Sequence, residues 1–181
     1  MIQPGTVTIP EARARWSRTW FAATALCATG GILISAFTAA HSTTGHFPTP
    51  AERAFNTFAF FTVQSNLIVG ATTLMLVLQP NRSSPVFATF RLIGVVAITV
   101  TGVVYHVALA SLLDLQGWDQ LGNQLVHTVV PVLAVVGWLV LGPRGLTSAR
   151  IACWSLAFPV LWLGFTLIRG AIVHWYPYPY H

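Results

Sequence analysis

Long apolar runs alternate with short polar segments along this chain, and the few charged residues fall in the polar segments. Four intervals hold no Asp, Glu, Lys or Arg: those between Arg18 and Glu52, Arg53 and Arg82, Arg91 and Asp114, and Asp119 and Arg144. Each interval is long enough for the roughly 20 helical residues that cross a hydrocarbon core of about 30 Å. The pattern predicts an all-α, polytopic transmembrane helix bundle.

Five membrane spans are expected, at residues 16–40, 54–78, 86–113, 121–141 and 150–175. The fifth is interrupted by one charge, Arg169. Pro131 and Pro159 lie inside the last two spans, and each is expected to bend its helix because proline has no backbone N–H to donate. Residues 1–15 predict a mobile cytoplasmic tail, and residues 16–181 a single transmembrane helical domain.

The positions of the basic residues predict the orientation of the bundle. Seven arginines precede the first span or flank the second and fourth connections: Arg13, Arg15, Arg18, Arg82, Arg91, Arg144 and Arg150. The positive-inside rule places these segments, and with them the N-terminus, in the cytoplasm. The formal net charge of +5 is thereby explained by topology. We expect a multi-pass protein of the cell membrane whose partner is the lipid bilayer and not nucleic acid, while its oligomeric state stays open.

The first span has a second interpretation as a cleaved signal peptide, because arginines precede it and small residues follow it. Its apolar run over residues 19–40 exceeds the usual apolar region of about 7 to 15 residues. A membrane span is therefore the preferred interpretation.

Polar side chains on four of the spans are expected at similar depth, in the outer half of the bilayer. At about 1.5 Å of rise per residue, Thr62 comes roughly 10 to 12 Å below the start of its span, with Asn66 one turn deeper. With the same rise per residue, three further side chains are expected roughly 9 to 10 Å from the outer ends of their spans: His106, His127 and Arg169. Ser65 adjoins Asn66, and Asn123 lies one turn above His127. Polar side chains are costly inside a membrane and usually mark a functional site. These residues therefore predict a polar chamber that serves as the functional site.

The residue types in this chamber limit its chemistry. It holds no carboxylate, which excludes a paired-carboxylate mechanism, and two histidines alone fall short of the three protein ligands usual for zinc. We therefore expect no metal or cofactor. A hydroxyl nucleophile with an imidazole base remains: His127 would deprotonate Thr62, and the alkoxide would attack an ester carbonyl. Oxyanion stabilisation or substrate positioning would fall to the other polar residues: Asn66, Arg169, Asn123, Ser65 and His106.

Structural roles compete with these assignments. A membrane threonine usually bonds a carbonyl of its own helix, and Arg169 is close enough to the span end to extend its guanidinium to the interface. His106 and His127, on adjacent helices, are also placed to hold a haem as axial ligands. A solute-binding or transport module is a third possibility. An absorption band in the visible range would distinguish the haem protein from the hydrolase.

Two short motifs resemble a known family. The stretch FFTVQSNLIVG at residues 60–70 and HTVVP at residues 127–131 are similar to the androgen-induced, FAR-17a-like membrane proteins. Animal members of that family are atypical threonine hydrolases of fatty acid esters of hydroxy fatty acids. The resemblance implies that Thr62 and His127 form the catalytic pair and that the substrate is a lipid ester. The segment GAIVHWYPYPY near the C-terminus also resembles the family's W-x-YPF-type segment.

The chain departs from the family pattern in two places. A bacterial branch with an F-x-T-x-QSN signature looks closer than the animal members, which do not generally carry Gln64, Ser65 and Asn66. This difference is compatible with another substrate. The family also typically has six spans, so with an end at His181 the chain is expected to be a five-span variant or to lack the last helix.

Overall fold

The structure is a computed structural model that describes residues 11–177, and all regular secondary structure in that part of the chain is helical. Five helical segments are long and apolar enough to cross a membrane: Ala14–His41, Phe61–Leu78, Pro85–Leu112, Gly117–Leu141 and Ala149–Val173. The expected all-α fold, with five helices long and apolar enough to span a membrane, is confirmed for the described residues. The helix that starts at Glu11 includes residues 11–15, so that part of the expected tail is helical; the other tail residues, and residues 178–181, lie outside the described part.

Several spans are built from more than one kind of helix. The α-helices are α1 (Glu11–His41), α2 (Pro50–Asn56), α3 (Phe61–Leu78), α4 (Pro85–Val104), α5 (Gly117–Gln124), α6 (Val130–Val136), α7 (Ala149–Ser155) and α8 (Ala157–Val173). Wider π-helical turns are η2 (Tyr105–Leu109), η4 (Leu125–Val129) and η5 (Gly137–Leu141). Tighter 3₁₀ turns are η1 (Thr57–Ala59) and η3 (Ala110–Leu112).

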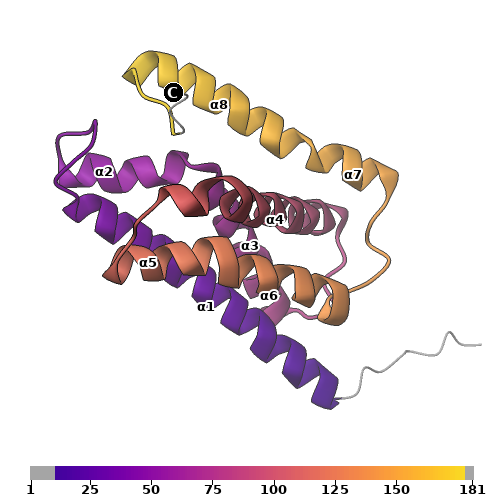
Figure 1. Ribbon diagram of the computed structural model, residues 1–181. Helices are drawn as coiled ribbons and strands as arrows, with labels where there is room; N and C mark the ends of the chain where they lie inside the picture. The colour runs from indigo at the N-terminus through magenta and orange to yellow at the C-terminus, as the bar shows by residue number, and fades with distance from the viewer. Residues whose placement is uncertain (1–10, 178–181) are drawn as a thin grey trace, which may run out of the picture.

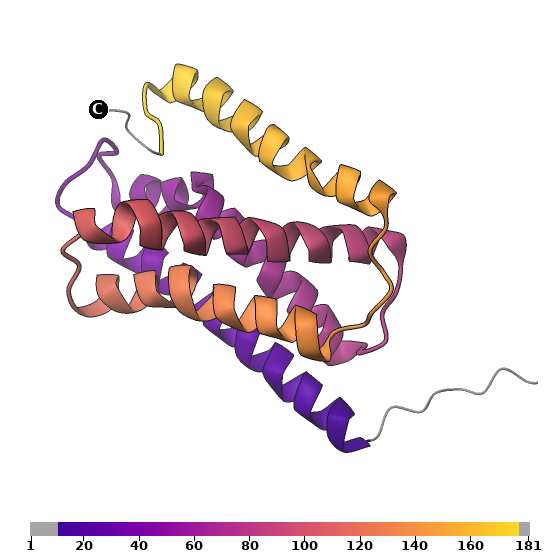
Figure 2. The same cartoon turned by 45° about the vertical axis from the view of Figure 1, so that its right-hand side comes forward.

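A compact bundle forms from α1, α3, α4 and the span that runs from α5 to η5, with α7 and α8 lying along one side of α4 (Figures 1 and 2). Its core is a cluster of small and branched side chains, one or two from each of these four spans: Ala28, Val69, Ile98, Val130 and Ala134. Small residues at the crossings bring the backbones close, as is usual between membrane helices. Any side chain at Gly102 would press on Pro131 and on the carbonyl oxygen of His127.

The second span does not begin where the sequence pattern predicted. A continuous helix was expected over residues 54–78, but α2 and η1 end before Phe60, whose backbone is extended (φ −73°, ψ 137°), and α3 starts at Phe61. Side chains bind the carbonyl groups that this break leaves free: Gln64 Nε2 donates to Phe58 O and Trp162 Nε1 to Ala59 O, each at 3.0 Å. The sequence has no proline or glycine at this break, and one local and one long-range side-chain hydrogen bond stabilise it.

Helix α2 is fixed at its start by local chemistry. The Thr49 hydroxyl accepts from the Glu52 backbone N–H at 3.2 Å, and the Glu52 carboxylate accepts from the Thr49 N–H at 3.0 Å, a capping box ahead of Pro50. Hydrogen bonds from the Thr49 hydroxyl and N–H lower the pKa of Glu52. A short helix of its own therefore precedes the second span.

The two span prolines coincide with interruptions, as expected. Pro131 cannot donate to the carbonyl of His127, and the π turn η4 directly precedes it. Pro159 cannot donate to the carbonyl of Ser155, where α7 ends, so the expected helix over residues 150–175 is split into α7 and α8. Each proline thus lies just after an interruption of the regular α-helix in its span.

Besides the Trp162 bond to Ala59 O, polar contacts near the C-terminal end of α8 attach it to the bundle. Arg169 Nη2 donates to Asn56 Oδ1 at 2.8 Å, and the guanidinium lies over the rings of Phe47 and Trp175. His46 Nε2 lies 3.0 Å from the carbonyl oxygen of Val173. Arg169 therefore joins α8 to α2.

The substitution Arg169→Met should lower the melting temperature in detergent. It removes the donor to buried Asn56, and an unpaired buried acceptor costs about 1–3 kcal/mol. Circular dichroism measures the effect, with Arg150→Met, a change at an exposed arginine of α7, as the control. Equal melting temperatures for the two variants would contradict the attachment.

Candidate functional site

The side chains of Thr62 and His127, which come from different spans, are in hydrogen-bond contact. Thr62 Oγ1 lies 3.3 Å from His127 Nε2. Thr62 is the second residue of α3 and His127 the middle residue of the π turn η4, and 65 positions separate them in the chain. The proximity expected from the sequence is therefore met.

The second ring nitrogen of His127 fixes the tautomer. Nδ1 lies 3.2 Å from the backbone carbonyl oxygen of Asn123, which can only accept a hydrogen bond, so Nδ1 carries the proton. Nε2 then offers its lone pair to the Thr62 hydroxyl. This is the arrangement that a general base requires. Asn123 thus contacts the imidazole through its backbone carbonyl, while its side-chain Nδ2 donates to the Tyr105 hydroxyl.

Tyr105 covers one face of the imidazole. Its ring stacks on that of His127 with centroids 4.3 Å apart and planes at 24°. The phenol oxygen accepts a hydrogen bond from Asn123 Nδ2, so its own O–H remains available to donate. Tyr105 is buried at the start of the π turn η2. It holds the imidazole in place and adds a hydroxyl donor at the site.

The break at Phe60 places the start of a long helix at Thr62. The first N–H groups of an α-helix have no carbonyl partner within the helix, and the helix dipole makes this end positive. In α3 these groups belong to Phe61, Thr62 and Val63, since the Gln64 N–H already bonds Phe60 O at 3.2 Å. The Thr62 hydroxyl thus lies where negative charge is stabilised. Thr62 therefore lies in the first turn of its helix, and not roughly 10 to 12 Å from the helix start as the sequence predicted.

A cavity of about 360 Å³ adjoins the pair. Its walls are mainly apolar, with Thr62, His127, Tyr105, Thr57 and Ser35 as the polar groups. Such a composition suits an apolar ligand that presents a single polar group. His127 also lines a groove of about 480 Å³ between α4 and α6, so it borders both spaces.

The three residues that follow Val63, which are Gln64, Ser65 and Asn66, have structural partners. Gln64 Nε2 donates to Phe58 O at the helix break, and Ser65 Oγ donates to Phe61 O in its own helix at 2.7 Å. Asn66 is fully buried and donates through Nδ2 to Thr62 O at 2.9 Å and to Val126 O at 3.2 Å. Both its N–H groups are used, so the expected oxyanion role of Asn66 is wrong. Asn66 instead fixes α3 against the turn that carries His127.

Two other expected site residues lie away from the pair. Arg169 binds Asn56 and does not line the cavity. His106 is exposed on the groove side, where its Nε2 lies 3.0 Å from Thr128 Oγ1. The Nε2 atoms of His106 and His127 thus face different threonines, an arrangement that does not suit axial ligation of one haem.

Sequence reasoning missed Tyr105 and Ser35. A tyrosine within an apolar run resembles an interfacial aromatic residue, and a serine on the first span resembles a helix-packing residue. The position of Tyr105 next to His106 in the sequence did not indicate a role in the site. Only the tertiary structure places Tyr105 on the imidazole of His127.

Asn66→Leu should destabilise the protein. The carbonyl oxygens of Thr62 and Val126 would lose their side-chain donor in a buried position, at a cost of about 1–3 kcal/mol. Thermal unfolding in detergent measures the loss, and Thr99→Val, which removes an exposed hydroxyl bonded to Val95 O, should change little. A melting temperature as high as that of Thr99→Val would refute the bracing role.

Comparisons of this chain with models of protein families, with curated proteins and with solved structures found no match. The resemblance to the FAR-17a-like family therefore stays a prediction from the short motifs around Thr62 and His127.

Proposed function

We propose that this protein is a hydrolase of lipid esters, embedded in the cell membrane, that uses Thr62 as nucleophile and His127 as base. The observation that carries the proposal is the 3.3 Å contact between Thr62 Oγ1 and His127 Nε2, with the imidazole held in the basic tautomer by Asn123 O. A nucleophile, a base and a group that orients the base make up the minimal set for acyl transfer.

The first half of the reaction forms an acyl-enzyme. His127 Nε2 takes the hydroxyl proton as Thr62 Oγ1 attacks the ester carbonyl carbon, and a tetrahedral oxyanion results. Collapse of this intermediate breaks the bond to the leaving alcohol, whose oxygen receives the proton from Nε2. Thr62 then carries the acyl group as an ester, and His127 is neutral again.

Water completes the cycle. His127 removes a proton from a water molecule in the cavity, and the hydroxide attacks the acyl carbon. The second tetrahedral intermediate collapses to a carboxylic acid, and Nε2 returns the proton to Thr62 Oγ1. The net reaction consumes one water and gives one acid and one alcohol.

Oxyanion stabilisation is assigned to two groups close to Thr62. The first is the N-terminal turn of α3, with its free N–H groups and positive end of the helix dipole. The second is the hydroxyl of Tyr105, a residue that lines the same cavity as Thr62. Donors of this kind act strongly in a site that excludes water.

The shape of the site favours an acyl chain as substrate. The cavity of about 360 Å³ has mostly apolar walls, among them Leu109, Leu112 and Leu113. The groove of about 480 Å³ on the other side of His127 opens between α4 and α6 on the surface that lipid would cover. A lipid ester is therefore expected to approach from within the bilayer.

A fluorophosphonate probe should label Thr62 covalently with release of fluoride. Labelling of the purified protein, measured by in-gel fluorescence, is expected to disappear in Thr62→Ala and in His127→Ala. The matched controls are Thr128→Ala and His106→Ala, which alter the second threonine–histidine contact of the structure. Labelling that persists without the Thr62 hydroxyl, or that is lost in Thr128→Ala, would reject Thr62 as nucleophile.

Tyr105→Phe should lower kcat for a p-nitrophenyl fatty acid ester by about 100-fold with a small change in KM, because loss of one oxyanion donor costs roughly that much. Steady-state hydrolysis in detergent micelles measures both constants. The control is Tyr176→Phe, at a tyrosine that packs against Gly170 away from the cavity. Unchanged kcat in Tyr105→Phe would remove the phenol from the oxyanion site.

A further inference from the structure

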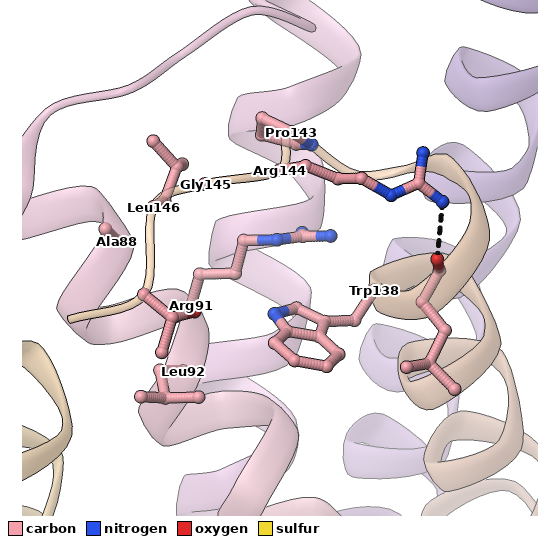
Figure 3. Close-up of a pocket in the computed structure, with 10 residues that line it drawn as sticks. Ala88, Arg91, Leu92, Trp138, Pro143, Arg144, Gly145 and Leu146 are labelled. Carbon is pink, nitrogen blue, oxygen red and sulfur yellow. Dashed lines mark hydrogen bonds between the residues drawn. The ribbon is translucent and has the colours of Figure 1, made fainter. Parts of the chain in front are cut away.

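A second polar cavity lies near the opposite end of α4 from Tyr105. Arg91 and Tyr105 are 14 positions apart on α4 and η2, which corresponds to roughly 20 Å of helix. The cavity has a volume of about 310 Å³ and lies between α4 and the segment that follows η5. Figure 3 shows Arg91 extending into it, with Trp138 on one side and the chain from Pro143 to Leu146 on the other. This site is independent of the proposed hydrolase.

Arg91 is buried, with 4% of its surface exposed, yet its charged end has free donors. Its Nε and Nη2 atoms are buried and have no hydrogen-bond partner. The guanidinium lies over the ring of Phe21, with Cζ 5.2 Å from the ring centroid, which uses the face of the group and leaves its edge free. Burial of a charge without hydrogen-bond partners is costly, and a bound ligand that accepts hydrogen bonds from Arg91 would lower this cost.

The two free donors identify the ligand chemistry. Nε–H and Nη2–H lie side by side on one edge of a guanidinium, and this edge forms paired hydrogen bonds with two oxygens of one oxyanion. Nη2 also lies against Gly142, where any side chain would collide with it. The Nη2 end of the guanidinium therefore lies directly against the backbone at Gly142.

The surroundings add positive charge and no negative charge. Arg144 lines the same cavity and uses Nη2 to donate to Leu139 O at 2.9 Å, which leaves its other N–H groups available (Figure 3). Trp138 and Thr147 add an indole N–H and a hydroxyl to the lining, and none of the lining residues is acidic. Two arginines without a counter-charge favour an anion with more than one acceptor oxygen.

We infer that this cavity binds a phosphate-type anion, held by the Nε–Nη2 edge of Arg91 and by Arg144. The cavity lies where α4 begins and the fourth span ends, the depth at which lipid headgroup phosphates lie. Phosphate reaches such a place either as the headgroup of an anionic phospholipid or as a free ion. Both sources offer the same oxygens to Arg91.

Three ligands distinguish the sources with the purified full chain in a neutral detergent. Phosphatidylglycerol is compared with phosphatidylcholine by native mass spectrometry, and inorganic phosphate with chloride at equal ionic strength by thermal shift. Oleate serves as the carboxylate probe in both assays. Selective binding of phosphatidylglycerol assigns a lipid headgroup, and a selective shift with inorganic phosphate assigns a free ion; either supports the site.

The variants test the residues. Arg144→Gln, Arg91→Lys and Gly142→Ala should each weaken binding by about tenfold or more, because each removes or displaces a charge-assisted donor. Gly142→Ala keeps every charge and is expected to fold, since the group it displaces is the far end of a flexible side chain. Arg150→Gln is the control, an exposed arginine outside the cavity.

Three results would overturn the inference. The first is an affinity for oleate equal to that for the phosphate ligands, which would make the site a general carboxylate site. The second is a wild-type protein that binds neither phosphate source selectively. The third is a loss of binding in Arg150→Gln as large as that in Arg144→Gln, which would point to general surface charge.

Discussion

The start of helix α3 at Phe61 is the constraint on which the candidate site depends. A helix that continued from α2 through residue 60 would use the N–H groups of residues 61–63 in its own hydrogen bonds and would turn Thr62 into an ordinary interior residue. The extended backbone at Phe60 instead puts the Thr62 hydroxyl at a positive helix end, 3.3 Å from the imidazole of His127. The break thus supplies the nucleophile with its electrostatic environment.

Thr62 directly follows a helix break and His127 lies in a π turn, and hydrogen bonds from side chains stabilise both irregularities. Gln64 and Trp162 satisfy the carbonyl groups at the break, and Asn66 binds the backbone of the π turn that carries His127. Pro131 leaves the His127 carbonyl without its usual donor one turn later. These are structural features that hold a threonine and a histidine together, and π turns of this kind are frequent at functional sites.

Hydrophobic runs and charge positions were enough to predict the membrane bundle. Spans of apolar residues bounded by charges require helices, because backbone groups in lipid must bond within their own segment. The contact between Thr62 and His127 was also predicted, from their depth and from a motif resemblance. The break at Phe60 was not, since it has no proline or glycine and depends on Trp162, which is 103 positions from Ala59.

The roles of the neighbouring polar residues could not be predicted from depth alone. Asn66 and Arg169 have the donors that an oxyanion needs, but the structure commits those donors to carbonyl and amide oxygens. Tyr105 has one ordinary hydroxyl and no motif, yet it stacks on the imidazole. Depth along a helix fixes the height of a side chain and leaves its direction and partners open.

Tandem mass spectrometry of the wild-type protein after reaction with a fluorophosphonate tests the central claim most directly. If Thr62 is the activated nucleophile, the phosphonyl group is found on Thr62, within the peptide that contains the QSN motif. An adduct on Thr128 or on another hydroxyl, with Thr62 unmodified, would contradict the account.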